Sequence, residues 1–244
     1  MKGVILAAGD GTRLEPLTIN CPKPLIAVAG RPLLDYTINA FVEAGIRELV
    51  IVVGYKAEAI KRYVGDGSRY GARVNYAFNP DYGLGNALSV YAAREAVGGE
   101  PFVLAMADHM ISLRILTTLL VQRDGLDTLC IDRLAHAPPQ VNDATRVWVN
   151  EANLVSSIGK RIRHWNAIDT GVFFFTPRIF TAISHLPHAG DEGCGISDGV
   201  TWLIKDGPGM RACDVSGAFW MDVDTLEDLR YVEHILLNKE EKNE

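Results

Sequence analysis

The feature that most constrains the fold is an alternation of short apolar runs with amphipathic segments in the first half of the chain. The runs Lys2–Ala7, Glu48–Val53 and Phe102–Met106 are rich in β-branched residues and almost continuously apolar. Strands of this kind are typical of parallel sheets that are covered on both faces. The segments between them carry apolar residues at helical spacing, and the clearest helix pattern begins at Leu34 and stops at Ala44-Gly45. We therefore expect right-handed β–α–β units and a doubly wound α/β sheet.

The second half of the chain has more strand candidates and fewer helices. Strand-like runs occupy Arg146–Val149, Leu154–Ile158 and Asp169–Phe175, and Glu151-Ala152-Asn153 is typical of a hairpin turn. Two helices should follow at Ile179–Ser184 and Ser197–Lys205, and then two strands at Met210–Asp214 and Phe219–Val223. A last helix should begin at Thr225, which forms a capping box with Asp228. No linker or repeat divides the chain. We expect one domain of residues 1–244, with halves of residues 1–125 and 126–244.

Composition excludes several classes of protein. The chain has 244 residues, 48% of them hydrophobic, and a formal net charge of −6. The apolar fraction is too high for a disordered chain, and no run reaches the roughly 18 apolar residues of a membrane span. The acidic balance is unlike that of nucleic-acid-binding proteins. Scattered cysteines indicate a reducing compartment, and we see no export signal, so we expect a cytoplasmic protein.

A glycine-rich loop follows the first expected strand. Its sequence is Leu6-Ala7-Ala8-Gly9-Asp10-Gly11-Thr12-Arg13-Leu14. Nucleotides bind at the carboxyl edge of α/β sheets, and Gly9 and Gly11 let the backbone approach a phosphate closely. The guanidinium of Arg13 adds a planar set of donors. The alternative interpretation is a tight turn without a ligand.

Two other nucleotide-binding loops are excluded by their residues. A dinucleotide-binding fingerprint requires a third glycine where Leu14 stands, and an acidic residue where Gly54-Tyr55 stand. A phosphate-binding P-loop requires Gly-Lys-Ser/Thr, whereas Gly159-Lys160 is followed by Arg161.

A second basic residue, Lys23, lies between Pro22 and Pro24. The prolines restrict the backbone and keep this segment out of a helix, so the lysine is presented rigidly. Its ammonium group can reach the same triphosphate as Arg13. Taken alone, the segment is better interpreted as a Pro-rich loop with a solvated lysine.

The two elements together, LAAGDGTRL followed by PKPL, resemble the N-terminal signature of sugar nucleotidyltransferases. Members of this family join a nucleoside triphosphate to a sugar phosphate or a similar phosphate and release pyrophosphate. The resemblance covers residues 1 to about 230 and implies a Rossmann-like, mostly parallel mixed sheet with an acceptor-binding, β-rich second half. It implies nucleotide-binding positions at Leu6, Ala7, Ala8, Gly9, Gly11, Thr12, Arg13, Lys23, Gly85, Asn86 and Asp108.

Three further segments extend the resemblance. Asp108 follows a hydrophobic strand, where the family places a magnesium-binding aspartate. Asp169-Thr170-Gly171 resembles the acceptor-binding strand, and Lys160 lies upstream, where a lysine meets the acceptor phosphate. The second metal ligand implied by the resemblance is Asp222 or Asp224, and the choice between them stays open. If both lie on one strand, their side chains should point to opposite faces, unless the strand ends between them. Mg²⁺ is thus the implied cofactor, and the implied catalytic residues are Arg13, Lys23 and Lys160.

The chemistry of nucleotidyl transfer accounts for these residue types. A phosphate monoester has a second pKa of about 6, so it is anionic at neutral pH and needs no general base. The task is to bring two polyanions together and to stabilise the charge on the transferring group. Carboxylates suit magnesium, and lysine or arginine suits phosphate. His109 therefore receives no proton-transfer role, and is interpreted as a packed residue or a group behind the metal ligands.

A finer resemblance is to the branch of the family that uses inositol-1-phosphate. It rests on Gly85-Asn86-Ala87-Leu88-Ser89, on Asp108-His109 and on the block from Ile158 to Phe173. It implies CTP as donor, inositol-1-phosphate as acceptor and CDP-inositol as product. A downstream membrane synthase and a homodimer are left open as partners. Asn86 either reads the base edge or caps the next helix.

Two alternatives to this function stay open. One is another nucleotidyltransferase, which acts on phosphocholine or on a hexose-1-phosphate. The other is a non-catalytic, nucleotide-binding regulatory module that keeps the fold.

Overall fold

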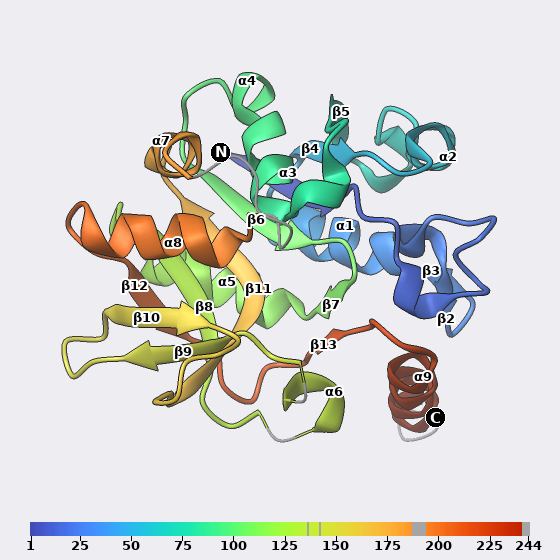
Figure 1. Cartoon of the computed structure of the whole chain (residues 1–244). Helices are drawn as coiled ribbons and strands as arrows, with labels where there is room; N and C mark the ends of the chain where they lie inside the picture. Colours follow the sequence, from blue (N-terminus) through green and yellow to red (C-terminus); the bar gives the residue numbers. More distant parts are fainter. Residues whose placement is uncertain (136, 142, 187–193, 241–244) are drawn as a thin grey trace.

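The computed structural model describes residues 1–135, 137–141, 143–186 and 194–240. A nine-stranded mixed sheet forms the centre of the fold (Figure 1). Its strands are β1 (Lys2–Ala7), β4 (Glu48–Val53), β5 (Arg73–Phe78), β6 (Phe102–Met106), β8 (Thr128–Asp132), β9 (Arg146–Val149), β10 (Val155–Gly159), β11 (Ala167–Phe175) and β12 (Arg211–Asp214). Seven of them lie in the order β10-β9-β11-β6-β1-β4-β5, while β8 pairs with β11 and β12. The α/β, doubly wound sheet expected from the sequence is confirmed.

The strands β1, β4, β5 and β6 form the parallel half of the sheet. Consecutive residues of β1 enter different cores, because Val4 and Leu6 pack on one face of the sheet and Ile5 and Ala7 on the other. Burial of both faces explains why the run is almost continuously apolar. The helices in this half are α1 (Leu33–Glu43), α2 (Ala57–Val64), α3 (Asn86–Ala92), α4 (Arg94–Val97) and α5 (Leu113–Gln122).

The strand β11 connects the two halves of the chain. It pairs antiparallel with β6 on one side and with β8 and β9 on the other. The prediction began this strand at Asp169, but it extends two residues further back, because Ala167 and Ile168 are buried and pair with β9. The hairpin of β9 and β10 turns at residues 151–153 as expected, with Asn153 at a φ of 59°. The single-domain interpretation stays a prediction.

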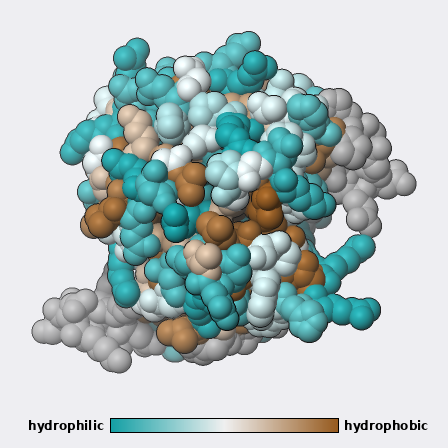
Figure 2. Space-filling model, turned by 90° about the vertical axis from the view of Figure 1, so that its left-hand side faces the viewer, coloured by the Kyte–Doolittle hydropathy of each residue, from teal (hydrophilic) through white to brown (hydrophobic). Residues whose placement is uncertain are grey.

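Helices also occur among the described residues of the second half (Figure 1). They are α6 (Pro138–Val141), α7 (Arg178–Ser184), α8 (Ile196–Lys205) and α9 (Leu226–Glu240). Short 3₁₀ turns are η1 (Thr12–Leu14), η2 (Lys23–Leu25), η3 (Ser68–Tyr70) and η4 (Tyr82–Leu84). On the face in Figure 2, apolar residues occur in small groups among polar ones. Within the described ranges, no helix combines the length and the apolar character needed to cross a membrane.

Two small sheets bring distant segments together at the edge of the main sheet. The strand β7 (His109–Ile111) pairs antiparallel with β13 (Trp220–Asp222), and this register places Asp222 opposite His109. The prediction carried the second strand to Val223, whereas β13 ends at Asp222, and Asp224 therefore lies outside it. The other small sheet joins β2 (Ala27–Val28) and β3 (Arg31–Pro32), and the helix α9 packs beside it through a shared apolar cluster.

Candidate active site

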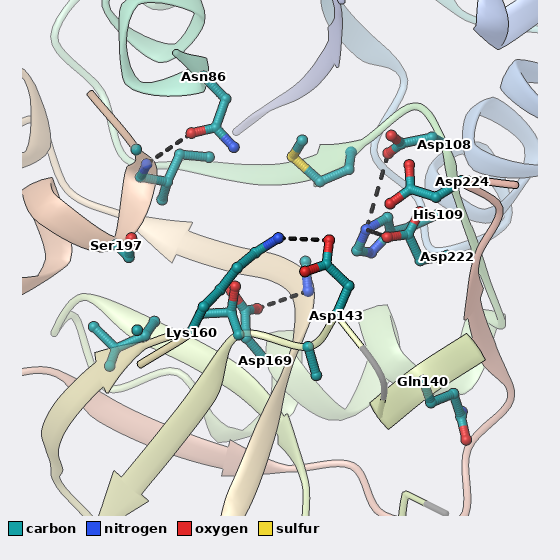
Figure 3. A pocket seen from close by; sticks show the side chains of 18 of the residues that line it. Asn86, Asp108, His109, Gln140, Asp143, Lys160, Asp169, Ser197, Asp222 and Asp224 are labelled. Atoms are coloured by element: carbon teal, nitrogen blue, oxygen red, sulfur yellow. Dashed lines mark hydrogen bonds and ion pairs between the residues drawn. The ribbon is translucent and has the colours of Figure 1, made fainter. Parts of the chain in front are cut away.

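A cleft of about 1020 Å³ opens where the parallel half meets the antiparallel half. Side chains from both halves reach into it (Figure 3). A smaller cavity of about 180 Å³ lies under the glycine-rich loop, and the two share Arg13, Asp108 and Asp224. The two cavities together are lined by most of the candidate site residues predicted from the sequence: Leu6, Ala7, Gly9, Gly11, Thr12, Arg13, Lys23, Asn86, Asp108, Lys160, Asp169, Gly171, Asp222 and Asp224.

Three of the selected positions line neither cavity. Ala8 is 2% exposed, and its carbonyl accepts a hydrogen bond from the backbone of Tyr55. Gly85 lies against the backbone of Cys194, where a Cβ atom would collide. Thr170 is fully buried, and its hydroxyl donates to a carbonyl on β8.

The glycine-rich loop is folded tightly over Lys23. Gly11 has a φ of 66°, and a Cβ atom there would lie 2.6 Å from the Cβ of Lys23. The carbonyl of Gly11 accepts a 3.0 Å hydrogen bond from the Thr18 hydroxyl. The turn therefore requires glycine both for its left-handed backbone and for its close contact with the lysine.

Lys23 is 6% exposed and lies among three carboxylates. Its Nζ donates to Asp108 Oδ2 at 2.7 Å and to Asp224 Oδ1, and lies 4.0 Å from Asp222. Burial alone would lower the pKa of the ammonium group, but the carboxylates outweigh burial and raise this pKa well above its ordinary range. Lys23 is thus charged and compensates part of the local negative charge.

The three aspartates differ in their environments. Burial raises the pKa of Asp108, but Lys23 outweighs it, so the pKa of Asp108 is lowered. Burial also raises the pKa of Asp224, but Lys23 and Arg13 together outweigh it and lower this pKa to about 2. For Asp222 burial prevails and the pKa is raised. Arg13 donates to Asp224, so both oxygens of Asp224 are engaged by cations.

His109 lies between two of these carboxylates. Its Nε2 is 3.6 Å from Asp222 Oδ2 and 3.9 Å from Asp108 Oδ1, while its Nδ1 is 2.9 Å from the carbonyl oxygen of Thr170. Burial by itself would lower the pKa of His109, but Asp222 and Asp108 raise it to about 10 in the metal-free protein. From the sequence, no role in proton transfer is expected of this residue, and in the structure its ring is held between two carboxylates and a backbone carbonyl.

The carboxylates fit a divalent cation. Asp108 Oδ1 and Asp222 Oδ1 are buried and have no hydrogen-bond partner among the described residues. Buried carboxylate oxygens without partners are costly, and a hard cation such as Mg²⁺ would satisfy them. Between the two aspartates left open by the sequence, Asp222 therefore has an oxygen available to a cation, whereas Asp224 has both of its oxygens in ion pairs.

On the acceptor side, Lys160 is paired with a residue that the sequence did not single out. Asp143 Oδ2 accepts from Lys160 Nζ at 2.7 Å (Figure 3) and also from Arg13 Nη1 at 3.0 Å. One carboxylate therefore links the cation expected at the acceptor to a cation expected at the nucleotide. Asp143 lies in a loop without periodic pattern, and no local sequence signal could have identified it.

Two further polar residues of the cleft have assigned hydrogen bonds. Asp169 Oδ1 accepts from the Gly171 amide at 2.7 Å, and burial raises the pKa of Asp169 to about 6. Asn86 Oδ1 accepts from the amide of Ile196 at 2.8 Å, so it connects the start of α3 to the start of α8. The sequence offered Asn86 as a cap of the helix that follows it, α3, but its side-chain oxygen instead accepts a hydrogen bond from the first residue of α8. Which ligands these residues contact stays a prediction.

Comparison with known proteins identifies relatives along nearly the whole chain. It is 36% identical over 236 residues to a bifunctional IPC transferase and DIPP synthase of Rubrobacter xylanophilus, which covers 96% of this chain and 51% of the relative. It is 31% identical over 241 residues to the low-salt glycan biosynthesis nucleotidyltransferase Agl11 of Haloferax volcanii. This alignment covers 97% of this chain and 66% of Agl11. The chain thus spans about half of the first relative and about two thirds of the second.

Solved structures share the fold. The inositol-1-phosphate CTP transferase from T. maritima superposes with a TM-score of 0.82 at 24% identity, covering 96% of this chain and 94% of that one. A UDP-glucose pyrophosphorylase in complex with UDP-glucose gives 0.83 at 19% identity, with 98% of each chain covered. The family model described as nucleotidyl transferase matches residues 2–239. This protein therefore belongs to the nucleotidyl transferase family.

Proposed function

We propose that this protein transfers a cytidylyl group from CTP to inositol-1-phosphate and releases pyrophosphate. The observation that carries the proposal is that Arg13, Lys23 and Lys160 converge on adjoining cavities beside Asp108 and Asp222. Nucleotidyl transfer requires such an arrangement, because two anionic phosphates must be brought together and the charge on the transferring group stabilised.

The reaction needs positioning and charge compensation. An oxygen of the acceptor phosphate attacks the α-phosphorus, the bond from that phosphorus to the bridging oxygen breaks, and pyrophosphate leaves with the electron pair. Arg13 and Lys23 hold the triphosphate, and Lys160 orients the acceptor phosphate. Asp108 and Asp222 would hold Mg²⁺, which would supply Lewis-acid stabilisation of the phosphate charge. No residue has to remove a proton, since the acceptor phosphate is already anionic.

The choice of CTP and inositol-1-phosphate is supported by the relatives named IPC transferase at 31% to 36% identity and by the sequence block from Ile158 to Phe173. A hexose-1-phosphate is the second candidate acceptor, because the chain is also 31% identical to a glucose-1-phosphate thymidylyltransferase of Streptomyces antibioticus. A non-catalytic regulatory module is disfavoured because Arg13, Lys23 and Lys160 are all present beside the unpartnered carboxylate oxygens of Asp108 and Asp222.

A pyrophosphate-release assay tests the proposal. The full chain is incubated in millimolar Mg²⁺ with CTP, UTP, dTTP, ATP or GTP, each crossed with inositol-1-phosphate, phosphocholine or glucose-1-phosphate. We expect the highest kcat/KM for CTP with inositol-1-phosphate. A preference for glucose-1-phosphate with dTTP or UTP would establish the second candidate, and no release with any pair would favour the regulatory module.

A variant pair ties the activity to the cleft. Asp108→Asn should lower pyrophosphate release by about 100-fold or more, as expected for the loss of an electrostatic element of the site. Asp81→Asn is the matched control, because Asp81 is exposed and lines neither cavity. Equal activity of Asp108→Asn and the wild type would refute the assignment of this cleft.

A further inference from the structure

We propose that His109 Nε2 is a ligand of the metal ion at this site, together with Asp108 and Asp222. The site should therefore bind a first-row transition cation, for which Mn²⁺ is the probe, more tightly than Mg²⁺. The inference rests on the proposed function in placing a divalent cation at this site. It differs from the expectation drawn from the sequence, in which aspartates alone held magnesium.

The first argument is the orientation of the imidazole ring. Nδ1 lies 2.9 Å from the carbonyl oxygen of Thr170, which can only accept a hydrogen bond, so Nδ1 is the donor. This leaves Nε2 on the side of the two carboxylates (Figure 3). A metal-binding histidine usually donates its other ring N–H to a carbonyl or carboxylate, which fixes the ring.

The second argument is distance. Nε2 lies 3.6 Å from Asp222 Oδ2 and 3.9 Å from Asp108 Oδ1, which is too long for hydrogen bonds. Two ligands at about 2.1 Å from one ion lie at most about 4.2 Å apart, so both separations are compatible with a shared cation. Ligand atoms of Asp108, His109 and Asp222 all lie within 4.8 Å of one another.

The third argument is that the carboxylates have oxygens left for a cation. Lys23 bonds to Asp108 through Oδ2, whereas Asp108 Oδ1, the oxygen nearer His109, is buried without a hydrogen-bond partner. Asp222 Oδ1 is also buried without a hydrogen-bond partner among the described residues, whereas the oxygen of Asp222 that lies nearer His109 is Oδ2. Lys23 therefore occupies one side of Asp108, and the other side is available to a metal ion.

The ring of His109 is also held in place by its neighbours. It stacks on Trp220, with ring centroids 6.4 Å apart and an interplanar angle of 27°. Gly171 also lies close to the ring, since it has a φ of 75° and a Cβ atom there would collide with Nδ1 of His109. A ligand fixed by its surroundings binds a metal at a lower cost in conformational entropy.

The donor set determines which cation is preferred. Magnesium favours oxygen ligands and keeps its waters, whereas imidazole suits the later divalent cations, whose affinities rise along the first transition series. Two carboxylates with one imidazole thus favour Mn²⁺, Co²⁺ or Zn²⁺ over Mg²⁺. Removal of the imidazole should reduce that preference and leave a site made of oxygens.

The test uses the full chain without nucleotide or acceptor, so its result is independent of the turnover assay. Binding of Mn²⁺ is measured by electron paramagnetic resonance, with Mg²⁺ as competitor, and nitrogen coordination by electron spin echo modulation. We compare wild type, His109→Gln and His164→Gln. The last is a control at an exposed histidine. Wild-type protein labelled with ¹⁵N-histidine reports the same ligand without any substitution.

We expect one Mn²⁺ per chain, with nitrogen modulation that changes on ¹⁵N labelling. His109→Gln should abolish the modulation and weaken Mn²⁺ binding by about tenfold or more, since even outer partners of a metal ligand are worth 10- to 100-fold. Its effect on Mg²⁺ should be smaller, and His164→Gln should match the wild type. The proposal is overturned by any of three results: no Mn²⁺ binding at millimolar concentration, no nitrogen modulation in the wild type, or unchanged modulation in His109→Gln.

Discussion

The ammonium group of Lys23 and the carboxylate of Asp108 lie 2.7 Å apart, although 85 positions separate them in the chain. The lysine begins the turn η2, over which the glycine-rich loop folds, and the aspartate follows the end of β6, which is the parallel neighbour of β1. Their contact joins the segment next to the glycine-rich loop to the proposed metal ligands. Each of the following predictions concerns one member of this network.

Replacement of Lys23 by methionine should abolish most of the activity and also destabilise the metal-free protein. The substitution leaves Asp108 and Asp224 without their ammonium partner, and the loss of one member of a buried ion pair costs about 3 kcal/mol. Thermal unfolding in EDTA and pyrophosphate release measure the two effects. Lys205→Met, at an exposed end of α8, is the control. Unchanged kcat/KM in Lys23→Met would contradict the role of this lysine.

Asp222 and Asp224 should respond differently to neutralisation. Asp222 has an unpartnered oxygen available to a cation, whereas Asp224 is paired with Lys23 and Arg13. In Asp222→Asn the Mg²⁺ concentration for half-maximal activity should rise about tenfold or more. In Asp224→Asn turnover should fall while the Mg²⁺ requirement stays nearly constant. Magnesium titrations of both variants check this, and the reverse result would make Asp224 the ligand.

Asp143→Asn should tighten the binding of anionic substrates. In the free protein its carboxylate competes with phosphate for Arg13 and Lys160. All three side chains are more than half exposed, and such pairs are worth about 0.2–1 kcal/mol, so we expect KM to fall about two- to fivefold. Glu227→Gln controls for the loss of one negative charge in the same cleft.

The effect of Asp143→Asn should shrink at high salt, because exposed ion pairs are screened. A rise in KM, or an equal fall in Glu227→Gln, would show that the carboxylate does not compete with substrate. The comparison is made at low and at high ionic strength with identical Mg²⁺.

Asp169 should make the metal-free protein less stable as the pH rises. Burial raises the pKa of Asp169 to about 6 in the folded protein, against about 3.9 when unfolded, so the folded state binds this proton more tightly. The contribution to stability is complete below about pH 4 and is lost as the pH rises through about 6. Asp169→Asn keeps an oxygen for the Gly171 amide and should remove this pH dependence, with a gain on the order of 2 kcal/mol at pH 8.

Urea unfolding in EDTA between pH 4 and pH 8 measures the difference between wild type and Asp169→Asn. The two curves should converge at the acid end, separate between about pH 4 and pH 6, and stay nearly parallel above pH 6. Parallel curves over the whole range would show that the proton on Asp169 is not linked to folding.

The strands and helices of the fold could be predicted from local pattern. The run of β1 is apolar because Val4 and Ile5 face different cores, and this burial leaves a continuous signal in the sequence. Boundaries were less accurate where pairing decides them. Ala167 and Ile168 belong to β11 because β9 lies beside them, and β13 stops at Asp222 because its partner β7 begins at His109.

The site could be predicted in part. The spacing of Gly11, Arg13 and Lys23 predicted a nucleotide-binding loop, and in the structure the three residues line one cavity, because tight turns and flanking prolines require particular residue types at fixed positions. Asp143 could not be found in this way, since an exposed aspartate in an irregular loop has no distinctive neighbours in the sequence. The environment of His109 was equally hidden, because its partners come from β11 and β13.

By itself, the sequence determined the class of fold, and it predicted a phosphate-binding loop and a set of carboxylates as metal ligands, since these depend on residue type and local spacing. Only the tertiary structure decided how they are shared. In the structure, Asp108 and Asp222 each have a buried oxygen without a hydrogen-bond partner among the described residues, whereas both oxygens of Asp224 are in ion pairs. His109 lies between the carboxylates of Asp108 and Asp222. The physical reason is that coordination and charge compensation depend on distances of a few ångströms between segments that only folding brings together.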